Sequence, residues 1–229
     1  MKDKDQNVIN TNLQEFNTFS ANFIKDKLEG MVNKKVLNIA LSGGSTPLPI
    51  LNMLKRFNLN WSMFNFYLVD ERVVNLNSSE SNYKNINDIF YQYISSKSYS
   101  ILQEDSTLDE MVSLYKKKIE KNLSFIKQNQ PKFDMIILGM GDDGHTASLF
   151  PNTEALNEKQ EFLVKNYIPQ LDCYRVTLTF SALLACEEII VLIKGKEKIK
   201  VFDEVINGEG KKFPISKLLS SKLNWIVGK

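Results

Sequence analysis

Short apolar runs alternate along the chain with stretches in which apolar residues recur every three or four positions. Apolar runs bounded by turn residues are typical of buried strands, and the wider spacing indicates helices packed along one face. The runs predict strands at residues 36–41, 64–69, 133–139, 162–166, 175–180, 188–193 and 223–227, with a short edge strand at 98–102. The amphipathic stretches predict helices at residues 11–34, 48–57, 81–93, 108–127 and 199–206, with short helical pieces at 181–186 and 214–219.

Strands that alternate with helices predict a mostly parallel sheet with helices on both faces. No linker rich in glycine, serine or proline interrupts the chain, and it contains no internal repeat or low-complexity segment. We therefore expect one α/β domain over residues 1–229, built on a Rossmann-like central sheet flanked by helices.

The composition fits this expectation and argues against several classes of protein. Hydrophobic residues make up 43% of the 229 residues and charged residues 24%, which is enough apolar material for a core. With 29 basic and 27 acidic residues, the net charge of +2 gives no general reason to expect a nucleic acid or a membrane as partner. No apolar run has the length of a membrane span, and the N-terminus carries no apolar signal segment. Cys173 and Cys186 have no metal-site or redox spacing, and two free thiols suit a cytoplasmic protein.

A glycine-rich turn follows the first predicted strand and leads directly into a helix. It consists of Ser42, Gly43, Gly44, Ser45 and Thr46, with Pro47 at the first helical position. Glycines let backbone N–H groups approach a ligand closely, and the helix dipole favours an anion such as a phosphate. We expect Thr46 to cap the helix. An ordinary tight strand–helix turn is the alternative, because the segment is neither a Walker loop nor a G-x-G-x-x-G loop.

Charged residues and glycines also follow three other predicted strands. They are Asp70-Glu71-Arg72 after strand 64–69, the turn 141–145 after strand 133–139, and the turn 195–198 after strand 188–193. Because the carboxyl ends of parallel strands lie on one edge of a sheet, these loops and the glycine-rich turn should meet there. Arg72 offers a planar fork suited to a phosphate or carboxylate, with a structural ion pair as the alternative. Which of Lys194, Lys196 and Lys198 reaches an anion stays open.

His145 is the only histidine, and it lies in a glycine-rich turn directly after a buried strand. An imidazole placed there suits proton transfer near neutral pH, and Asp143 suits the fixing of its tautomer. A histidine that only caps or packs is the alternative. A metal site would lack a second His and a nearby Cys, and a serine nucleophile would lack a G-x-S-x-G turn. We expect acid–base chemistry on a small phosphorylated substrate, and the role of Asp142 stays open.

Four segments together form a recognisable pattern: LSGGSTP at residues 41–47, VDERVV at 69–74 with SNY at 81–83, GMGDDGHTASLFP at 139–151, and RVTLT at 175–179. In order and approximate spacing they resemble the 6-phosphogluconolactonases, and the resemblance extends over most of the chain. It implies a sugar-phosphate isomerase-like fold that hydrolyses 6-phospho-D-glucono-1,5-lactone in the pentose phosphate pathway. It implies no cofactor and no metal, with His145 as the base that activates water and Asp143 as the residue that orients it.

The resemblance also implies how the substrate is held. The phosphate would be bound by Ser42, Gly43, Gly44, Ser45, Thr46, Arg72 and Lys198. Arg175, Asp70 and Asn82 would make further contacts with the substrate, and backbone N–H groups of the glycine-rich loops would stabilise the oxyanion. The partner is then a phosphorylated sugar lactone, and the protein is a monomer or a small homo-oligomer.

Two other functions remain open at this point. The related glucosamine-6-phosphate deaminases have a similar Asp-Gly-His turn, but Arg72 and the segment 146–150 favour the lactonases. A non-catalytic sugar-phosphate sensor on the same fold often carries a helix-turn-helix domain, and only one helix has room before residue 36.

Overall fold

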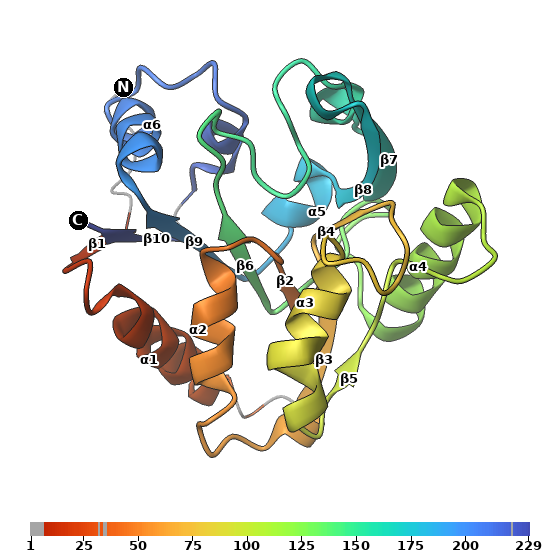
Figure 1. Cartoon of the computed structure of the whole chain (residues 1–229), viewed down its shortest axis with the longest axis horizontal. Coiled ribbons are helices and arrows are strands. Elements are labelled where there is room, and N and C mark those ends of the chain that lie inside the picture. Colours follow the sequence, from red (N-terminus) through yellow and green to blue (C-terminus); the bar gives the residue numbers. More distant parts are fainter. Residues whose placement is uncertain (1–6, 32, 34–35, 221) are drawn as a thin grey trace.

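The computed structural model describes residues 7–31, 33, 36–220 and 222–229, and its centre is a sheet of seven strands (Figure 1). The strand order is β1-β10-β9-β6-β2-β3-β5, and every neighbouring pair runs parallel. The strands are β1 (Asn7–Thr11), β2 (Leu37–Leu41), β3 (Phe64–Leu68), β5 (Lys97–Ser98), β6 (Met135–Gly139), β9 (Glu188–Lys194) and β10 (Leu223–Gly228). The expected α/β class with a mostly parallel central sheet is confirmed. That a single domain extends over all of residues 1–229 stays a prediction.

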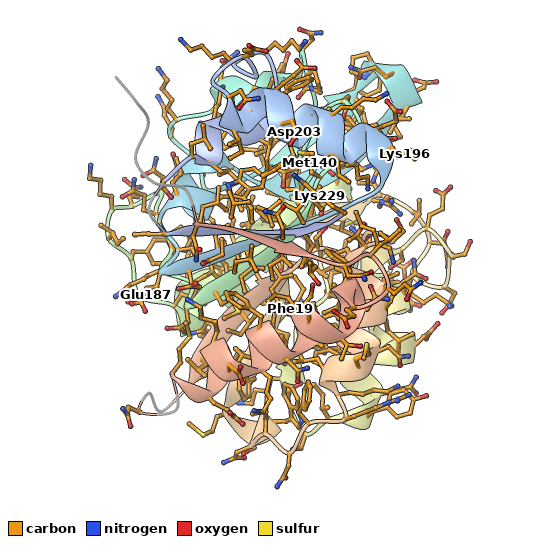
Figure 2. All side chains as sticks on the ribbon, turned by 90° about the vertical axis from the view of Figure 1, so that its left-hand side faces the viewer. Phe19, Met140, Glu187, Lys196, Asp203 and Lys229 are labelled. Atoms are coloured by element: carbon orange, nitrogen blue, oxygen red, sulfur yellow. The ribbon has the colours of Figure 1, made fainter. Side chains whose placement is uncertain are left out.

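Helices cover both faces of this sheet, which explains why its inner strands read as continuous apolar runs. α1 (Phe16–Glu29), α2 (Pro47–Leu54) and α3 (Asn82–Ile89) lie side by side on one face (Figure 1). α6 (Lys196–Ile206) lies on the opposite face from α1, with the strands between them (Figure 2). The remaining helices are α4 (Leu108–Asn122), α5 (Phe180–Leu184) and the 3-10 helices η1 (Trp61–Met63), η2 (Tyr91–Tyr93), η3 (Glu154–Asn157), η4 (Pro169–Leu171) and η5 (Pro214–Leu218).

A small antiparallel sheet lies beside the main one. In it, β4 (Asp70–Arg72) pairs with β8 (Cys173–Leu178), and β8 pairs with β7 (Leu163–Ile168). Val69 joins the two sheets, because its N–H donates to the carbonyl of Leu41 and its own carbonyl accepts the N–H of Leu178. One continuous apolar core lies under both sheets.

The strand order of the main sheet reverses between β2 and β6. The chain runs from β2 to β3 and β5 on one side, and from β6 to β9 and β10 on the other. In open α/β sheets, ligands bind at such a reversal, outside the carboxyl ends of the strands. Glu187 precedes β9 and Lys196 follows it, so the end of the sheet near Lys196 in Figure 2 is the carboxyl edge.

The N-terminal region differs most from the sequence prediction. The helix predicted at residues 11–34 begins only at Phe16 and ends at Glu29, with residues 32 and 34–35 outside the described residues. Thr11 instead ends β1, a strand that the sequence pattern did not predict. The strand NVINT contains only two apolar residues, and its position is fixed by backbone pairing with β10 rather than by an apolar run.

Other corrections are local. Thr46 precedes α2 as expected, but its side chain makes no capping hydrogen bond. The edge strand predicted at 98–102 is only Lys97–Ser98, and the helix predicted at 108–127 ends at Asn122. Strands 162–166 and 175–180 exist but belong to the antiparallel sheet, and Asp70, expected to follow a strand, itself begins β4.

Candidate active site

Two adjoining cavities lie at the carboxyl edge of the main sheet, beside the reversal of strand order. The first, of about 220 Å³, is bounded by the glycine-rich turn after β2, the turn after β6, Arg72 and Lys198. The second, of about 320 Å³, is bounded by residues shared with the first and by Asp70, Asn82, Phe150, Leu171 and Arg175. Because Arg72 and His145 line both cavities, the cavities are two lobes of one site.

His145 lies between the two lobes, and Asp143 holds its ring. Nδ1 of His145 is 2.6 Å from Oδ1 of Asp143, and the same oxygen accepts the backbone N–H of His145 at 3.0 Å. Burial acts to raise the pKa of Asp143, but the hydrogen bonds and charge of His145 outweigh it and hold that pKa below its ordinary value. An ionised Asp143 places the proton of a neutral imidazole on Nδ1, which leaves Nε2 as the acceptor. Within the described part of the chain, Nε2 makes no hydrogen bond.

The glycine-rich turn forms another part of the wall. Ser42, Gly44, Ser45 and Thr46 line the first lobe. The backbone N–H groups of residues 43–46 make no hydrogen bond to any described residue. These groups stand before the first turn of α2, where N–H donors and the helix dipole favour an anion.

Gly43 has a different place in this turn, because it lines neither lobe. A Cβ at Gly43 would lie 2.5 Å from the side chain of Asn82, so the turn and the start of α3 pack together only because residue 43 is glycine. Nδ2 of Asn82 donates to the carbonyl of Asp70 at 3.0 Å. The absence of a Cβ at Gly43 therefore makes room for the lining residue Asn82.

Two arginines face each other in the small sheet. Arg72 in β4 and Arg175 in β8 are direct partners in the antiparallel ladder, so their side chains lie on the same face. Arg72 donates from Nη1 to the carbonyl of Glu80 at 2.5 Å, while the buried Nε of Arg175 has no partner among the described residues. No ion pair in that part of the chain includes either arginine, so the ion-pair alternative for Arg72 is not supported. Like charges placed opposite each other repel, and an anion between them would relieve the repulsion.

Lys198 lines the first lobe from the first turn of α6. Lys194 and Lys196 line neither lobe, and the Nζ of Lys194 lies 5.7 Å from the centre of the Phe16 ring. Lys198 is thus the lysine of the three that the fold places at the site. Asp142 also lines neither lobe.

Alternation along β4 sends its two carboxylates in opposite directions. Asp70 lines the second lobe, and its Oδ2 accepts a hydrogen bond from the buried Ser148 hydroxyl at 2.6 Å. Glu71 is fully buried and accepts the backbone N–H groups of Arg72 and Asn82 at 2.8 and 2.7 Å. Burial raises the pKa of Glu71, although the N–H donors oppose the rise. Glu71 ties the strand that carries Arg72 to the helix that carries Asn82.

The sequence predicts no role for three residues that shape the site: Glu71, Ser148 and Phe150. The ring of Phe150 stacks on that of His145, with 3.8 Å between ring centres and 19° between planes. Ser148 is bound through its hydroxyl to Asp70. The place of Ser148 and Phe150 after His145 was the available signal, but spacing along the chain does not tell where a hydroxyl or a ring points.

The described residues show neither a metal-ligand cluster nor a membrane-spanning helix. Residues 7–31, 33, 36–220 and 222–229 contain no group of three or more His, Cys, Asp or Glu side chains placed to hold a metal ion. Over the same ranges, every helix is too short or too polar to cross a membrane.

Comparison with known proteins gives the family. A family model described as glucosamine-6-phosphate isomerases/6-phosphogluconolactonase matches residues 12–226. A 6-phosphogluconolactonase of Thermotoga maritima is 34% identical over 210 residues, which cover 90% of this chain and 91% of that protein. One of Chlamydia pneumoniae is 32% identical over 222 residues, which cover 91% of this chain and 81% of that protein. The crystal structure of a 6-phosphogluconolactonase from Thermotoga maritima matches 98% of this chain and 100% of its own, with a TM-score of 0.85 at 28% identity. The chain belongs to the glucosamine-6-phosphate isomerase/6-phosphogluconolactonase family.

Proposed function

We propose that this protein hydrolyses 6-phospho-D-glucono-1,5-lactone to 6-phosphogluconate, the lactonase step of the oxidative pentose phosphate pathway. One observation carries the proposal: an imidazole held at Nδ1 by Asp143 lines a site whose other walls supply Arg72, Lys198 and free backbone N–H groups. A lactone is an activated ester, so water and a positioned base suffice for its hydrolysis.

In the proposed reaction, Nε2 of His145 removes a proton from water as the water oxygen bonds to C1 of the lactone. The former carbonyl oxygen then carries a negative charge, which backbone N–H groups of the glycine-rich loops stabilise. When this intermediate collapses, the bond from C1 to the ring oxygen breaks, and His145 returns its proton to that oxygen. Asp143 keeps the tautomer and stabilises the imidazolium between the two transfers. The product acid ionises and releases a proton to solution.

The substrate phosphate is assigned to Arg72, Lys198 and the turn of residues 42–46. Arg175 is assigned to the same anionic end, because its buried Nε lacks a partner among the described residues and it faces Arg72. Asp70 and Asn82 line the second lobe, and their carboxylate and amide suit the sugar hydroxyls. The side chains assigned to the phosphate and those assigned to the hydroxyls thus line adjoining parts of one site, which His145 also lines.

The deciding experiment measures proton release from freshly generated 6-phosphogluconolactone, above its spontaneous rate of hydrolysis. Acid release that is proportional to enzyme concentration supports the proposal, and release at the spontaneous rate overturns it. Since the family also contains glucosamine-6-phosphate isomerases, a coupled assay with glucosamine 6-phosphate runs in parallel. A ligand-induced rise in Tm without any turnover would instead indicate a sugar-phosphate sensor.

The proposal also includes a cytoplasmic location and a monomeric or small homo-oligomeric state. Both cysteines, Cys173 and Cys186, are free, which suits a reducing compartment. Sedimentation of the purified chain measures the oligomeric state directly.

A further inference from the structure

The closest ring contact among the described residues is the one between His145 and Phe150. Their centres are 3.8 Å apart and their planes are inclined by 19°, whereas every other ring pair in the described part of the chain is separated by at least 4.9 Å. The phenyl ring therefore covers one face of the imidazole almost in parallel. This contact has no part in the mechanism described above.

Two other contacts act on the edge of the same imidazole. Asp143 binds Nδ1, and the Cα of Gly141 lies so close that a Cβ there would be 2.2 Å from both Nδ1 and Cε1. With one edge held and one face covered, the imidazole cannot rotate about its Cβ–Cγ bond without leaving either Asp143 or Phe150. Neither contact uses Nε2, which makes no hydrogen bond to any described residue.

Phe150 is itself fixed by its backbone. Its carbonyl accepts the N–H and the hydroxyl of Thr153 at 3.3 and 2.8 Å, and the preceding Leu149 donates its N–H to Thr146 at 3.0 Å. The side chain is only 9% exposed. The phenyl ring thus provides a rigid surface for the imidazole, not a mobile neighbour.

We propose that Phe150 is a positioning residue of the hydrolysis, whose ring holds the imidazole plane of His145 so that Nε2 stays directed at the attacking water. The role rests on the proposed lactonase function. Such a role is expected to matter for the rate, because a displacement of about 1 Å at a reacting group can lower rates by about 100-fold. The face of the phenyl ring also attracts the imidazolium that forms during each turnover.

The test compares Phe150→Leu, which keeps an apolar side chain but removes the flat ring, with Phe150→Tyr, which keeps the ring. We expect kcat of Phe150→Leu to fall by about 10- to 100-fold with KM within about twofold, and Phe150→Tyr to recover most of the loss. Phe162→Leu is the matched control, because Phe162 is buried and packed edge-to-face against Phe125 but lines neither lobe. It should lower Tm without lowering kcat.

A second measurement uses the fact that the chain has one histidine, so its imidazole C–H signals in a proton NMR spectrum are unambiguous. The phenyl ring current should shift these signals upfield in the wild type and in Phe150→Tyr, and the shift should vanish in Phe150→Leu. This measurement shows that the stack exists whether or not the protein turns over lactone.

Four results would overturn the inference. An unchanged kcat in folded Phe150→Leu would mean that the stack has no role in the reaction. A raised KM with unchanged kcat would make Phe150 a substrate contact. An equal loss of kcat in Phe162→Leu would make the effect a general one of the core. A wild-type protein that shows the ring-current shift but releases no acid would refute the proposed function, and the catalytic role of Phe150 with it.

Discussion

The two sheets build the site in different ways. The main parallel sheet contributes the segments that follow its strands, and these carry His145, Lys198 and the free N–H groups of residues 43–46. The small antiparallel sheet contributes side chains from the face of its ladder, among them Arg72 and Arg175. The loops aim a base and backbone donors, whereas the ladder sets two charges at a fixed spacing. We therefore expect changes in the turn after β6 to act on kcat and changes in the ladder to act on KM.

The largest effect is expected from His145→Asn. Without the base, kcat should fall by about 10²- to 10⁴-fold, the usual contribution of a positioned general base. KM should change little, because the proposed phosphate contacts are made by other residues. Steady-state proton release from fresh lactone measures both constants. Near-normal turnover in the variant would mean that His145 is not the base. It would also contradict the expectation that changes in the turn after β6 act on kcat.

A smaller loss of kcat is expected from Asp143→Asn. The amide cannot fix the same tautomer or balance the imidazolium, and the ring loses its hydrogen bond at Nδ1, so a loss of about 100-fold is expected. Asp142→Asn is the matched control, because it removes the neighbouring carboxylate at a position that lines neither lobe. Equal losses in both variants would mean that the turn responds to net charge and not to the bond between Asp143 and His145.

These two residues lie in the part of the site that the sequence predicts best. A buried strand, a glycine-rich turn and a lone histidine are local features, and the placement of such turns at the carboxyl edge follows from parallel topology. The structure places Arg72, Lys198 and His145 around one cavity at that edge, as predicted. The roles of all these residues stay predictions.

The antiparallel sheet was harder to predict because its defining contacts are not local. Asp70, Glu71 and Arg72 read as a charged strand end, and only pairing with β8 shows that alternation buries Glu71 while Asp70 and Arg72 line the site. The pairing of Arg72 with Arg175 joins residues from distant segments. β1 was missed for the same reason, since its pairing with β10 joins the two ends of the described chain.

Arg175→Met tests the expected effect of the antiparallel sheet on KM. The substitution keeps an apolar stem and removes the charge. Loss of a charge-assisted hydrogen bond costs about 1.5–3 kcal/mol, so KM should rise by about 10- to 100-fold with kcat within a few-fold. In the absence of ligand, removal of one of two facing arginines should not lower Tm, because their repulsion is relieved. A rise in Tm with 6-phosphogluconate should be smaller for the variant than for the wild type.

The outcome that contradicts this assignment is specific. If Arg175→Met lowers kcat and leaves KM unchanged, then Arg175 acts on the reacting atoms and the division between the two sheets fails. If Tm falls sharply without ligand, Arg175 supports the fold, and its partnerless Nε is not evidence of an anion site.

The smallest effect is expected from a change at Gly43, where the glycine-rich turn contacts the start of α3. In Gly43→Ala the new Cβ would meet the Asn82 side chain at 2.5 Å, so Asn82 or the turn must shift. Overpacking of this kind costs about 1–3 kcal/mol of stability, and the shift of Asn82 should raise KM by a few-fold. Gly44→Ala is the matched control for stability, because a Cβ there meets nothing nearer than Pro47 Cδ at 3.8 Å. Urea unfolding of both variants decides the matter: equal stabilities would mean that Gly43 and Asn82 are not packed as described.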